Sequence, residues 1–261
     1  MHSARRGKWL WAAALAVYAF LYLPLCIVVV YSFNDSRLNA EWVGFTWHWY
    51  DLLLHDQALL EAAVNSLFIA LLSSLFATLL GTMAGLAMHR FRSGLLTFLV
   101  LTPLAMPEIL LGVSLLLFFI QVLNLTLGML SIVLAHTTFS IGFVAVIVRA
   151  RLAGIDESLF EAARDLGASP WDCFRHVTFR LILPSVVAGA LMAFTLSLDD
   201  FVITFFTAGV GVSTLPLHIY SMIKISVTPE VNAASTLLML LTLTLIVAAS
   251  RFAPDALKGR S

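Results

Sequence analysis

The apolar positions of the chain fall into six long runs, each about the length needed to cross a membrane as a helix. A hydrocarbon core about 30 Å thick requires roughly 20 consecutive apolar residues in a helix. The pattern therefore predicts an all-α membrane protein with six transmembrane helices, forming a single transmembrane domain over residues 1–261. The runs lie at about 9–33, 64–88, 95–120, 130–150, 181–207 and 230–250.

Composition supports this prediction and excludes several other classes of protein. The chain is 61% hydrophobic and only 11% charged, which leaves too little polar surface for a soluble globule. Its net charge of zero excludes a strongly basic nucleic-acid binder. Because Cys26 lies in an apolar run and Cys173 in a charged segment, we expect no disulfide framework. The histidines show no metal-ligand spacing, so we expect no metal site.

The distribution of basic residues predicts the direction of the helices. Lys and Arg concentrate on the cytoplasmic side of membrane proteins. If both termini are cytoplasmic, every basic residue lies on that side except Arg37 and Lys224. The residues that this topology places inside are Arg5, Arg6, Lys8, Arg90, Arg92, Arg149, Arg151, Arg164, Arg175, Arg180, Arg251, Lys258 and Arg260.

Residues 150–180 interrupt the apolar pattern with a segment that has the character of a soluble helical protein. Asp156 can cap a helix that Gly167 would end, because aspartate accepts from the first turn and glycine adopts the left-handed conformation after the last. The sequence SPWD at 169–172 combines a second cap with a proline at the first helical position. The segment therefore predicts a helix, a sharp turn and a second helix that leads into the fifth run.

The charges of this segment indicate what it contacts. An amphipathic helix that lies on an anionic membrane surface carries a strongly basic polar face. Here acidic residues balance the arginines, which favours a protein partner, and we expect Phe160 and Trp171 to be exposed toward it. The acidic residues are Asp156, Glu157, Glu161, Asp165 and Asp172.

The centre of the segment resembles a family motif. Glu161-Ala162-Ala163, followed after three residues by Gly167, is similar to the EAA motif of ATP-binding-cassette (ABC) importer permeases. The resemblance implies a type I ABC importer (MetI-like) permease fold, in which this cytoplasmic coupling helix docks on an ATPase subunit. The family pattern continues with Ile-x-Leu-Pro, whereas this chain has Val-Thr-Phe-Arg at 177–180 and its Leu-Pro at 183–184. The residues that we expect to take part in ATPase coupling are Phe160, Glu161, Ala162, Ala163, Asp165, Gly167 and Trp171.

Three further stretches resemble the spermidine/putrescine permeases: FTLSLDDFVITFF at 194–206, TLPLHIYSMIK at 214–224 and PEVNAASTLL at 229–238. The resemblance implies a permease subunit that moves polyamines across the bacterial inner membrane by alternating access. It also implies two ATPase subunits, a homologous sister permease and a periplasmic substrate-binding protein as partners. The chain has no G-x-x-x-x-G-K-[ST] loop, so we expect ATP and Mg²⁺ on the ATPase partners and no cofactor on this chain.

Three carboxylates occupy the apolar runs. Glu108 follows two prolines in the third run, and Asp199 and Asp200 lie in the outer half of the fifth. A charged residue at the centre of a membrane helix costs on the order of 3 kcal/mol, so such residues usually face a bundle interior or an aqueous cavity. On a continuous fifth helix, Ser197, Asp200 and Thr204 would share one face as a polar stripe, and Asp199 would lie on a neighbouring face.

Two interpretations of these carboxylates remain open. In one, they line a path for a cationic solute, where carboxylates replace water around an amine, aromatic rings offer their faces and prolines free backbone carbonyls. In the other, an aspartate pairs with an arginine or a helix N-terminus of a partner subunit. Lys224 would be either a counter-ion for an aspartate or a gate that a polyamine displaces. The residues that we expect along the substrate path are Glu108, Ser197, Asp199, Asp200, Thr204, Tyr220 and Lys224.

Other transport functions also agree with parts of the pattern. The solute could be another small cation or an amino acid carried by the same kind of permease. An ion-coupled secondary transporter would use the intramembrane carboxylates as proton or sodium sites. That alternative leaves the EAA segment unexplained. The apolar runs contain no nucleophile–base pair or metal-ligand spacing, so they do not indicate an enzyme.

Several other polar or small residues are expected to serve packing. Gly81 and Gly85 form a G-x-x-x-G pattern, and small residues of this kind let membrane helices approach closely. His136 and the hydroxyl residues that follow it predict a hydrogen-bonded cluster between helices rather than a ligand site. The tryptophans of the outer segment at about 34–63 form an interfacial belt or line an outer vestibule.

Overall fold

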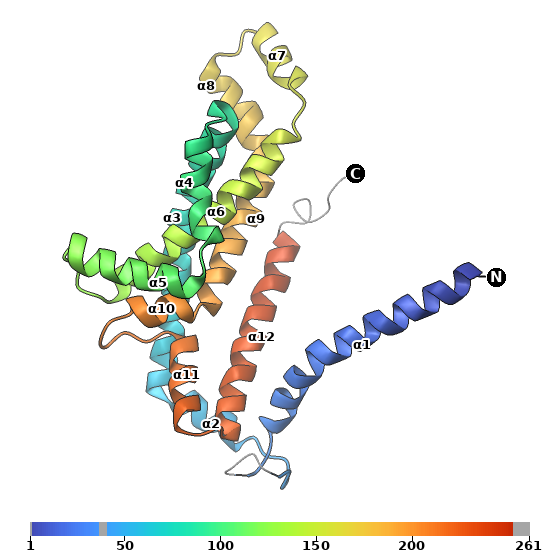
Figure 1. Cartoon of the computed structure of the whole chain (residues 1–261), viewed down its shortest axis with the longest axis vertical. Coiled ribbons are helices and arrows are strands. Elements are labelled where there is room, and N and C mark those ends of the chain that lie inside the picture. The colour runs from blue at the N-terminus through green and yellow to red at the C-terminus, as the bar shows by residue number, and fades with distance from the viewer. Residues whose placement is uncertain (1, 37–40, 253–261) are drawn as a thin grey trace. The chain divides into compact units, whose positions relative to one another are not determined.

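The computed structural model describes residues 2–36 and 41–252, and within them the chain is helical (Figure 1). Among these residues, β pairing is limited to one bridge between Asn34 and Phe45. The described residues exclude the side chains at 2–8, 12 and 248–252. The basic residues of the predicted topology that lie outside the described residues are Arg37, Lys258 and Arg260, together with the side chains of Arg5, Arg6, Lys8 and Arg251.

The helices follow one another with short connections. Their bounds are α1 (His2–Tyr31), α2 (His48–His55), α3 (Gln57–Phe91), α4 (Gly94–Ala105), α5 (Glu108–Leu117), the π-helix η1 (Phe118–Val122), α6 (Met129–Ala153), α7 (Ser158–Asp165), α8 (Pro170–Asp172), the π-helix η2 (Cys173–Thr178), α9 (Phe179–Asp199), α10 (Val202–Thr207), α11 (Leu215–Ile225) and α12 (Pro229–Phe252).

Five helical stretches of the described residues are long and apolar enough to cross a membrane, and a bent pair makes a sixth span if it is counted as one. These stretches match the six predicted runs. The five are Trp9–Tyr31, Gln57–Phe91, Met129–Ala153, Pro170–Asp199 and Pro229–Val247, and the bent pair is Gly94–Ala105 with Glu108–Val122.

Two of the predicted runs are wrong in detail, because each is broken where one helix was expected. The run at 95–120 bends by 108° between α4 and α5. Met106 and Pro107 are extended there, with ψ of 139° and 134°. Proline lacks an N–H and disfavours the helical conformation for the residue before it, which favours a break at this point. The run at 181–207 ends its first helix at Asp199, and Asp200 is extended with ψ of 126° before α10 begins.

The chain forms two compact units. The first unit comprises residues Met1–Leu60 and His218–Leu241, and the second comprises Glu61–Leu217 and Thr242–Ser261. The second unit contains α4 to α10 and most of α3. It therefore carries both the predicted coupling segment and the carboxylates of the third and fifth runs.

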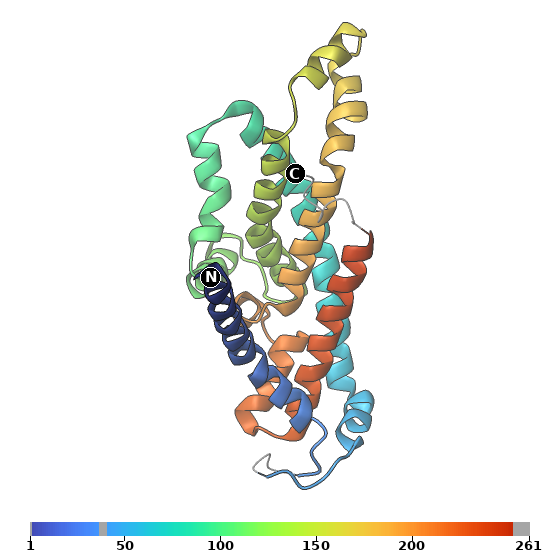
Figure 2. The ribbon, with the colours of Figure 1, turned by 90° about the vertical axis from the view of Figure 1, so that its right-hand side faces the viewer.

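The core of the second unit is built around α6. This helix packs along α9 and also contacts α4 and α10, while α5 packs against α10 (Figures 1 and 2). Buried apolar side chains fill the contacts of α6 with α3 and α9, and of α6 with α5 and α10. These side chains are Ala77, Val144, Val148, Leu152, Ile182 and Ala193 in one cluster and Leu111, Leu115, Phe119, Ala135 and Ile203 in another.

The predicted G-x-x-x-G contact is confirmed, and it joins α3 to α6. A Cβ atom added to Gly81 would lie 2.6 Å from Val144 Cβ, and one added to Gly85 would lie 2.8 Å from the Ala145 carbonyl oxygen. Real Cβ atoms do not approach other atoms so closely. The two backbones are therefore in contact at these glycines, as expected for small residues between membrane helices.

In the first unit, the connection from α1 to α2 folds around Asn34. Its side chain donates to the Glu41 carbonyl at 2.8 Å and accepts from the Val43 N–H at 2.9 Å. The indole N–H of Trp49 donates to the Asn34 carbonyl at 2.8 Å. Exposed aromatic rings surround this connection, and Trp47 is 62% exposed. The belt and vestibule interpretations of the tryptophans both remain predictions.

Candidate functional site

The coupling segment folds as its local signals predict. The Asp156 carboxylate accepts from the Ser158 N–H at 2.9 Å, and this hydrogen bond also lowers the pKa of Asp156. After α7, Gly167 adopts a left-handed φ of +82°, and its N–H donates to the Arg164 carbonyl at 2.8 Å. Ser169 then caps α8, because its Oγ accepts from the Asp172 N–H at 3.2 Å. The expected order of helix, turn and helix is confirmed.

The segment continues without interruption into the fifth span. α8 passes into the π-helix η2, which leads directly into α9. The part of the chain that departs from the family pattern, 177–180, lies at this junction. Pro184 lies inside α9 and does not end it. A π-helix adds one residue to a turn and often marks a functional position in a membrane or enzyme helix.

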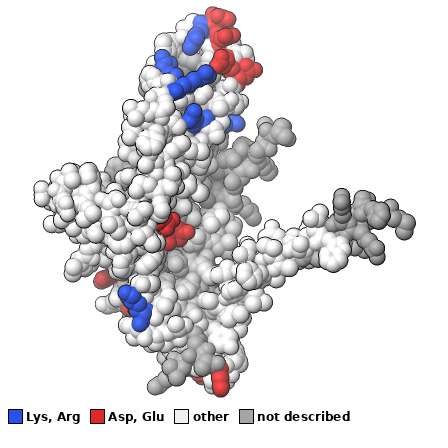
Figure 3. All heavy atoms as spheres, in the orientation of Figure 1, with Lys and Arg blue, Asp and Glu red and all other residues white. Residues whose placement is uncertain are grey.

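The segment presents charge and apolar surface together at one end of the second unit. Figure 3 shows acidic and basic side chains gathered over α7 and α8. Trp171 is 65% exposed and Leu166 is 89% exposed, so this charged surface also carries large apolar side chains. Phe160 is half-buried rather than exposed as predicted, because α7 packs back against η2. The other predicted coupling residues are exposed, except for half-buried Ala163: they are Glu161, Ala162, Asp165, Gly167 and Trp171.

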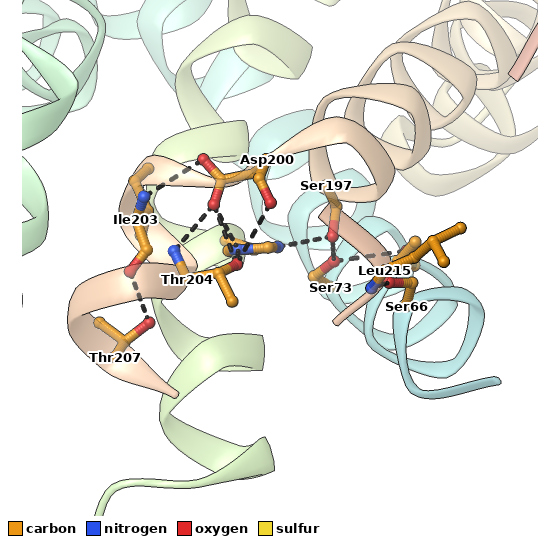
Figure 4. A network of polar contacts seen from close by, with 10 residues as sticks. Ser66, Ser73, Ser197, Asp200, Ile203, Thr204, Thr207 and Leu215 are labelled. Carbon is orange, nitrogen blue, oxygen red and sulfur yellow. Dashed lines mark hydrogen bonds and ion pairs between the residues drawn. The ribbon is translucent and has the colours of Figure 1, made fainter. Parts of the chain in front are cut away.

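A buried polar network lies at the break between α9 and α10 (Figure 4). Asp200 accepts from the Thr204 N–H at 2.8 Å and from the Thr204 hydroxyl at 3.0 Å. Its other oxygen accepts from the Ile203 N–H at 3.4 Å. These bonds satisfy the first turn of α10, whose N–H groups have no helical partner.

His136 of α6 completes this network. Its Nδ1 lies 2.7 Å from Ser197 Oγ, and its Nε2 lies 2.9 Å from Thr204 Oγ1 and 3.2 Å from Asp200 Oδ2. Ser73 of α3 donates to Ser197 at 2.9 Å. The network therefore joins α3, α6, α9 and α10.

The prediction that His136 forms hydrogen bonds between helices is confirmed, but the partners predicted for it are wrong. Thr137 and Thr138 donate to carbonyls of their own helix, at 2.7 Å and 2.8 Å. The partners of His136 come instead from residues more than 60 positions later in the chain, at Ser197 and Thr204. No local sequence pattern signals this contact.

The residues predicted along a substrate path separate into three groups. Ser197 and Thr204 are buried within the second unit, and the Asp200 side chain is only 9% exposed. Glu108 and Asp199 are exposed on the same unit, and they lie close enough for their charges to interact.

Glu108 stands at the first position of α5, just after the bend, and Asp199 is the last residue of α9. Two breaks in membrane helices thus place carboxylates on the surface of one unit. Tyr220 and Lys224 belong to the first unit, where the Lys224 Nζ lies 5.1 Å from the centroid of the Tyr220 ring. Lys224 therefore makes a cation–π contact along α11.

Comparison with known proteins identifies the family. Residues 77–259 match the family described as "Binding-protein-dependent transport system inner membrane component". The spermidine/putrescine transport system permease protein PotC of Escherichia coli (strain K12) is 42% identical over 253 residues, which cover 94% of each chain. The chain belongs to this family of binding-protein-dependent transport system inner membrane components. The putrescine transport system permease protein PotI of the same strain is 41% identical over 243 residues, covering 90% of this permease and 86% of PotI.

Solved structures show the same fold. A bacterial ABC transporter that imports the acidic polysaccharide alginate has a chain that aligns with a TM-score of 0.76 at 15% identity, covering 98% of this permease and 99% of that chain. An inward-facing methionine ABC transporter, MetNI, aligns with a TM-score of 0.66 at 22% identity, covering 77% and 96%. The predicted type I importer fold is confirmed for this permease. These two matches carry no information about its solute.

Proposed function

We propose that the chain is the permease subunit of an ATP-driven importer that moves spermidine or putrescine across the inner membrane by alternating access. The observation that carries this proposal is the 42% identity to PotC over 94% of both chains. Two exposed carboxylates at helix breaks, Glu108 and Asp199, support a cationic solute. Alternatives with another small cation or amino acid would use the same fold.

The exposed carboxylates suit a polyamine for a chemical reason. A polyamine carries ammonium groups separated by methylene chains, so several separate carboxylates can each replace water around one ammonium group. Glu108 and Asp199 supply two of them. Ser197, Asp200 and Thr204 would act indirectly, because their hydrogen bonds stabilise the fold at the end of α9.

Energy would enter through the coupling segment. Two ATPase subunits would bind ATP and Mg²⁺, and their closure would move α7 and α8 of this permease and of a homologous sister permease. The exposed charges around Glu161 and Asp165, together with Trp171, form the surface that such an ATPase subunit would bind. A periplasmic binding protein would deliver the polyamine. This arrangement requires the coupling segment and both termini in the cytoplasm.

The test is transport by the complete complex. The permease, its sister permease and the ATPase subunits would be reconstituted into liposomes, with the binding protein outside. We expect uptake of labelled spermidine or putrescine that requires ATP inside and is competed by the other polyamine but not by arginine or choline. A complex with an ATPase subunit unable to hydrolyse ATP is the control. Uptake driven by an ion gradient without ATP would contradict the proposal, as would preference for a solute other than a polyamine.

A further inference from the structure

His136 holds the two sides of the break in the fifth span. Its Nδ1 lies 2.7 Å from Ser197 Oγ on α9, before the break, and its Nε2 lies 2.9 Å from Thr204 Oγ1 on α10, after it. The same Nε2 lies 3.2 Å from the carboxylate of Asp200 at the break itself. The histidine is 2% exposed, so these contacts are sheltered from water.

The hydrogens of the network can be assigned consistently. Asp200 accepts from two backbone N–H groups and from the Thr204 hydroxyl, which is the bonding pattern of an ionised carboxylate. Because the Thr204 hydroxyl hydrogen is used there, its oxygen can accept from His136 Nε2–H. Ser73 donates to Ser197, and Ser197 can donate to His136 Nδ1. Every member is then satisfied with a neutral imidazole that carries its hydrogen on Nε2.

The break gives two adjacent aspartates different surroundings. Asp200 turns inward to His136 and the start of α10, whereas Asp199, the last residue of α9, is exposed. A continuous helix would separate the two side chains by about 100° around its axis, with nothing to fix which of them faces outward. The contacts of His136 select one arrangement, because they hold Asp200 on the inside.

We propose that His136 is a positioning residue for Asp199: by binding Ser197, Asp200 and Thr204 it fixes the break, and the break directs the Asp199 carboxylate into the solute path. Only the statement that Asp199 faces a solute path rests on the function proposed above. Its geometric claim concerns the orientation of one side chain and can be measured without a solute.

The test uses two amides that each reproduce half of the imidazole. The amide nitrogen of glutamine reaches the position of Nε2 and donates as Nε2–H does, and the amide oxygen of asparagine reaches the position of Nδ1 and accepts as Nδ1 does. His136→Gln therefore keeps the bonds to Thr204 and Asp200, His136→Asn keeps only the bond to Ser197, and His136→Leu keeps neither. Each would be combined with Asp199→Cys, in a permease that also carries Cys26→Ala and Cys173→Ala, and purified within the complete transporter.

The measurement is the rate at which a charged, water-soluble thiol reagent modifies position 199 in the absence of solute. We expect rapid modification with His136 or with His136→Gln. We expect rates about tenfold lower, or more, with His136→Asn and His136→Leu, because bonds to a charged group that hold the break are lost. Arg92→Cys, in the exposed turn between α3 and α4, is the matched control and should react equally in all four backgrounds.

Two results would overturn the proposal. Slow modification of position 199 with His136 intact would mean that Asp199 does not face water. Equal rates in the glutamine and asparagine backgrounds, in complexes recovered at equal yield, would mean that the Nε2 bonds do not orient it. Neither result would contradict the proposal that the transporter imports polyamines. Conversely, finding a different solute would not change these modification rates. The two proposals can therefore fail separately.

Discussion

The imidazole of His136 and the carboxylate of Asp200 lie 3.2 Å apart, with 2% and 9% of their side chains exposed. One lies in the first third of α6, and the other directly follows the end of α9. The contact means that Asp200 belongs to the internal structure of the permease as well as to the predicted path. Its pairing resembles the alternative in which an aspartate meets a helix N-terminus, with the difference that the partners lie in the same subunit.

Replacing Asp200 by asparagine should therefore lower stability. Whichever way the amide is turned, its nitrogen faces a donor: the Ile203 N–H in the place of Oδ1, or the Thr204 N–H and His136 in the place of Oδ2. Loss of a hydrogen bond to a charged group costs about 2 kcal/mol. We expect a lower midpoint of thermal denaturation for the purified permease with Asp200→Asn, measured by loss of monodispersity on heating.

Asp51→Asn is the matched control, because Asp51 is 77% exposed and its substitution should leave the midpoint unchanged. A double-mutant cycle makes the test specific to the pair. The loss from His136→Leu with Asp200→Leu should be smaller than the sum of the two single losses, since no unpaired buried charge remains. Additive losses would show that the two side chains do not depend on each other.

The break at Asp200 was not predicted, although the span that contains it was evident. The apolar run continues through 181–207 without a proline or glycine between Asp199 and Val202. The break combines local bonds, in which Asp200 satisfies the first turn of α10, with tertiary bonds of His136 on α6. Hydrophobic periodicity reflects only residues that are close in the sequence, so it predicts one continuous helix across this position. At the other break, Pro107 provided a local signal, but its bend of 108° depends on packing that proline does not specify.

Neutralising the exposed carboxylates should weaken the interaction with a polyamine. Glu108→Gln and Asp199→Asn keep the shape of each side chain and remove its charge. If these groups bind ammonium, each substitution should raise the KM for spermidine uptake about tenfold, because one charge-assisted contact is lost. Asp51→Asn is again the control. An unchanged KM in both variants, with normal assembly, would remove Glu108 and Asp199 from the path.

The turn of the coupling segment should tolerate asparagine better than alanine. Gly167 has a φ of +82°, a left-handed conformation that costs other residues roughly 1 kcal/mol and that asparagine adopts more readily than most. No atom lies within 4 Å of a Cβ added there, so conformation alone decides the effect. Gly167→Ala should hydrolyse ATP yet import fewer polyamines per ATP, and Gly167→Asn should lie closer to the natural protein. Equal losses in the two variants would show that the backbone conformation of the turn does not limit coupling.

The coupling segment was the most predictable part of the site because its signals are local. Asp156, Gly167 and Ser169 act within a few residues, as side-chain caps and a left-handed turn. The proximity of Glu108 to Asp199 had no such signal, since it arises only when α5 packs on α10. Sequence reasoning therefore found the individual carboxylates without their arrangement.

The contact of α3 with α6 at Gly81 should not accept even one methyl group. A Cβ there would lie 2.6 Å from Val144 Cβ and 2.8 Å from the Ile141 carbonyl oxygen, and neither atom can move without its backbone. Overpacking of this kind costs about 1–3 kcal/mol. Gly81→Ala should lower the thermal midpoint of the permease, whereas Gly94→Ala, where a Cβ meets nothing within 4 Å, should not.

A second substitution distinguishes backbone contact from side-chain crowding. Val144→Ala removes both methyl groups of the valine but keeps its Cβ and leaves the Ile141 carbonyl in place. Because those two atoms make the shortest contacts with the added methyl, Val144→Ala should fail to rescue Gly81→Ala. Full recovery of the thermal midpoint in the double variant would show instead that the added methyl clashes only with the methyl groups of Val144. Gly81 would then not be required for a direct backbone contact.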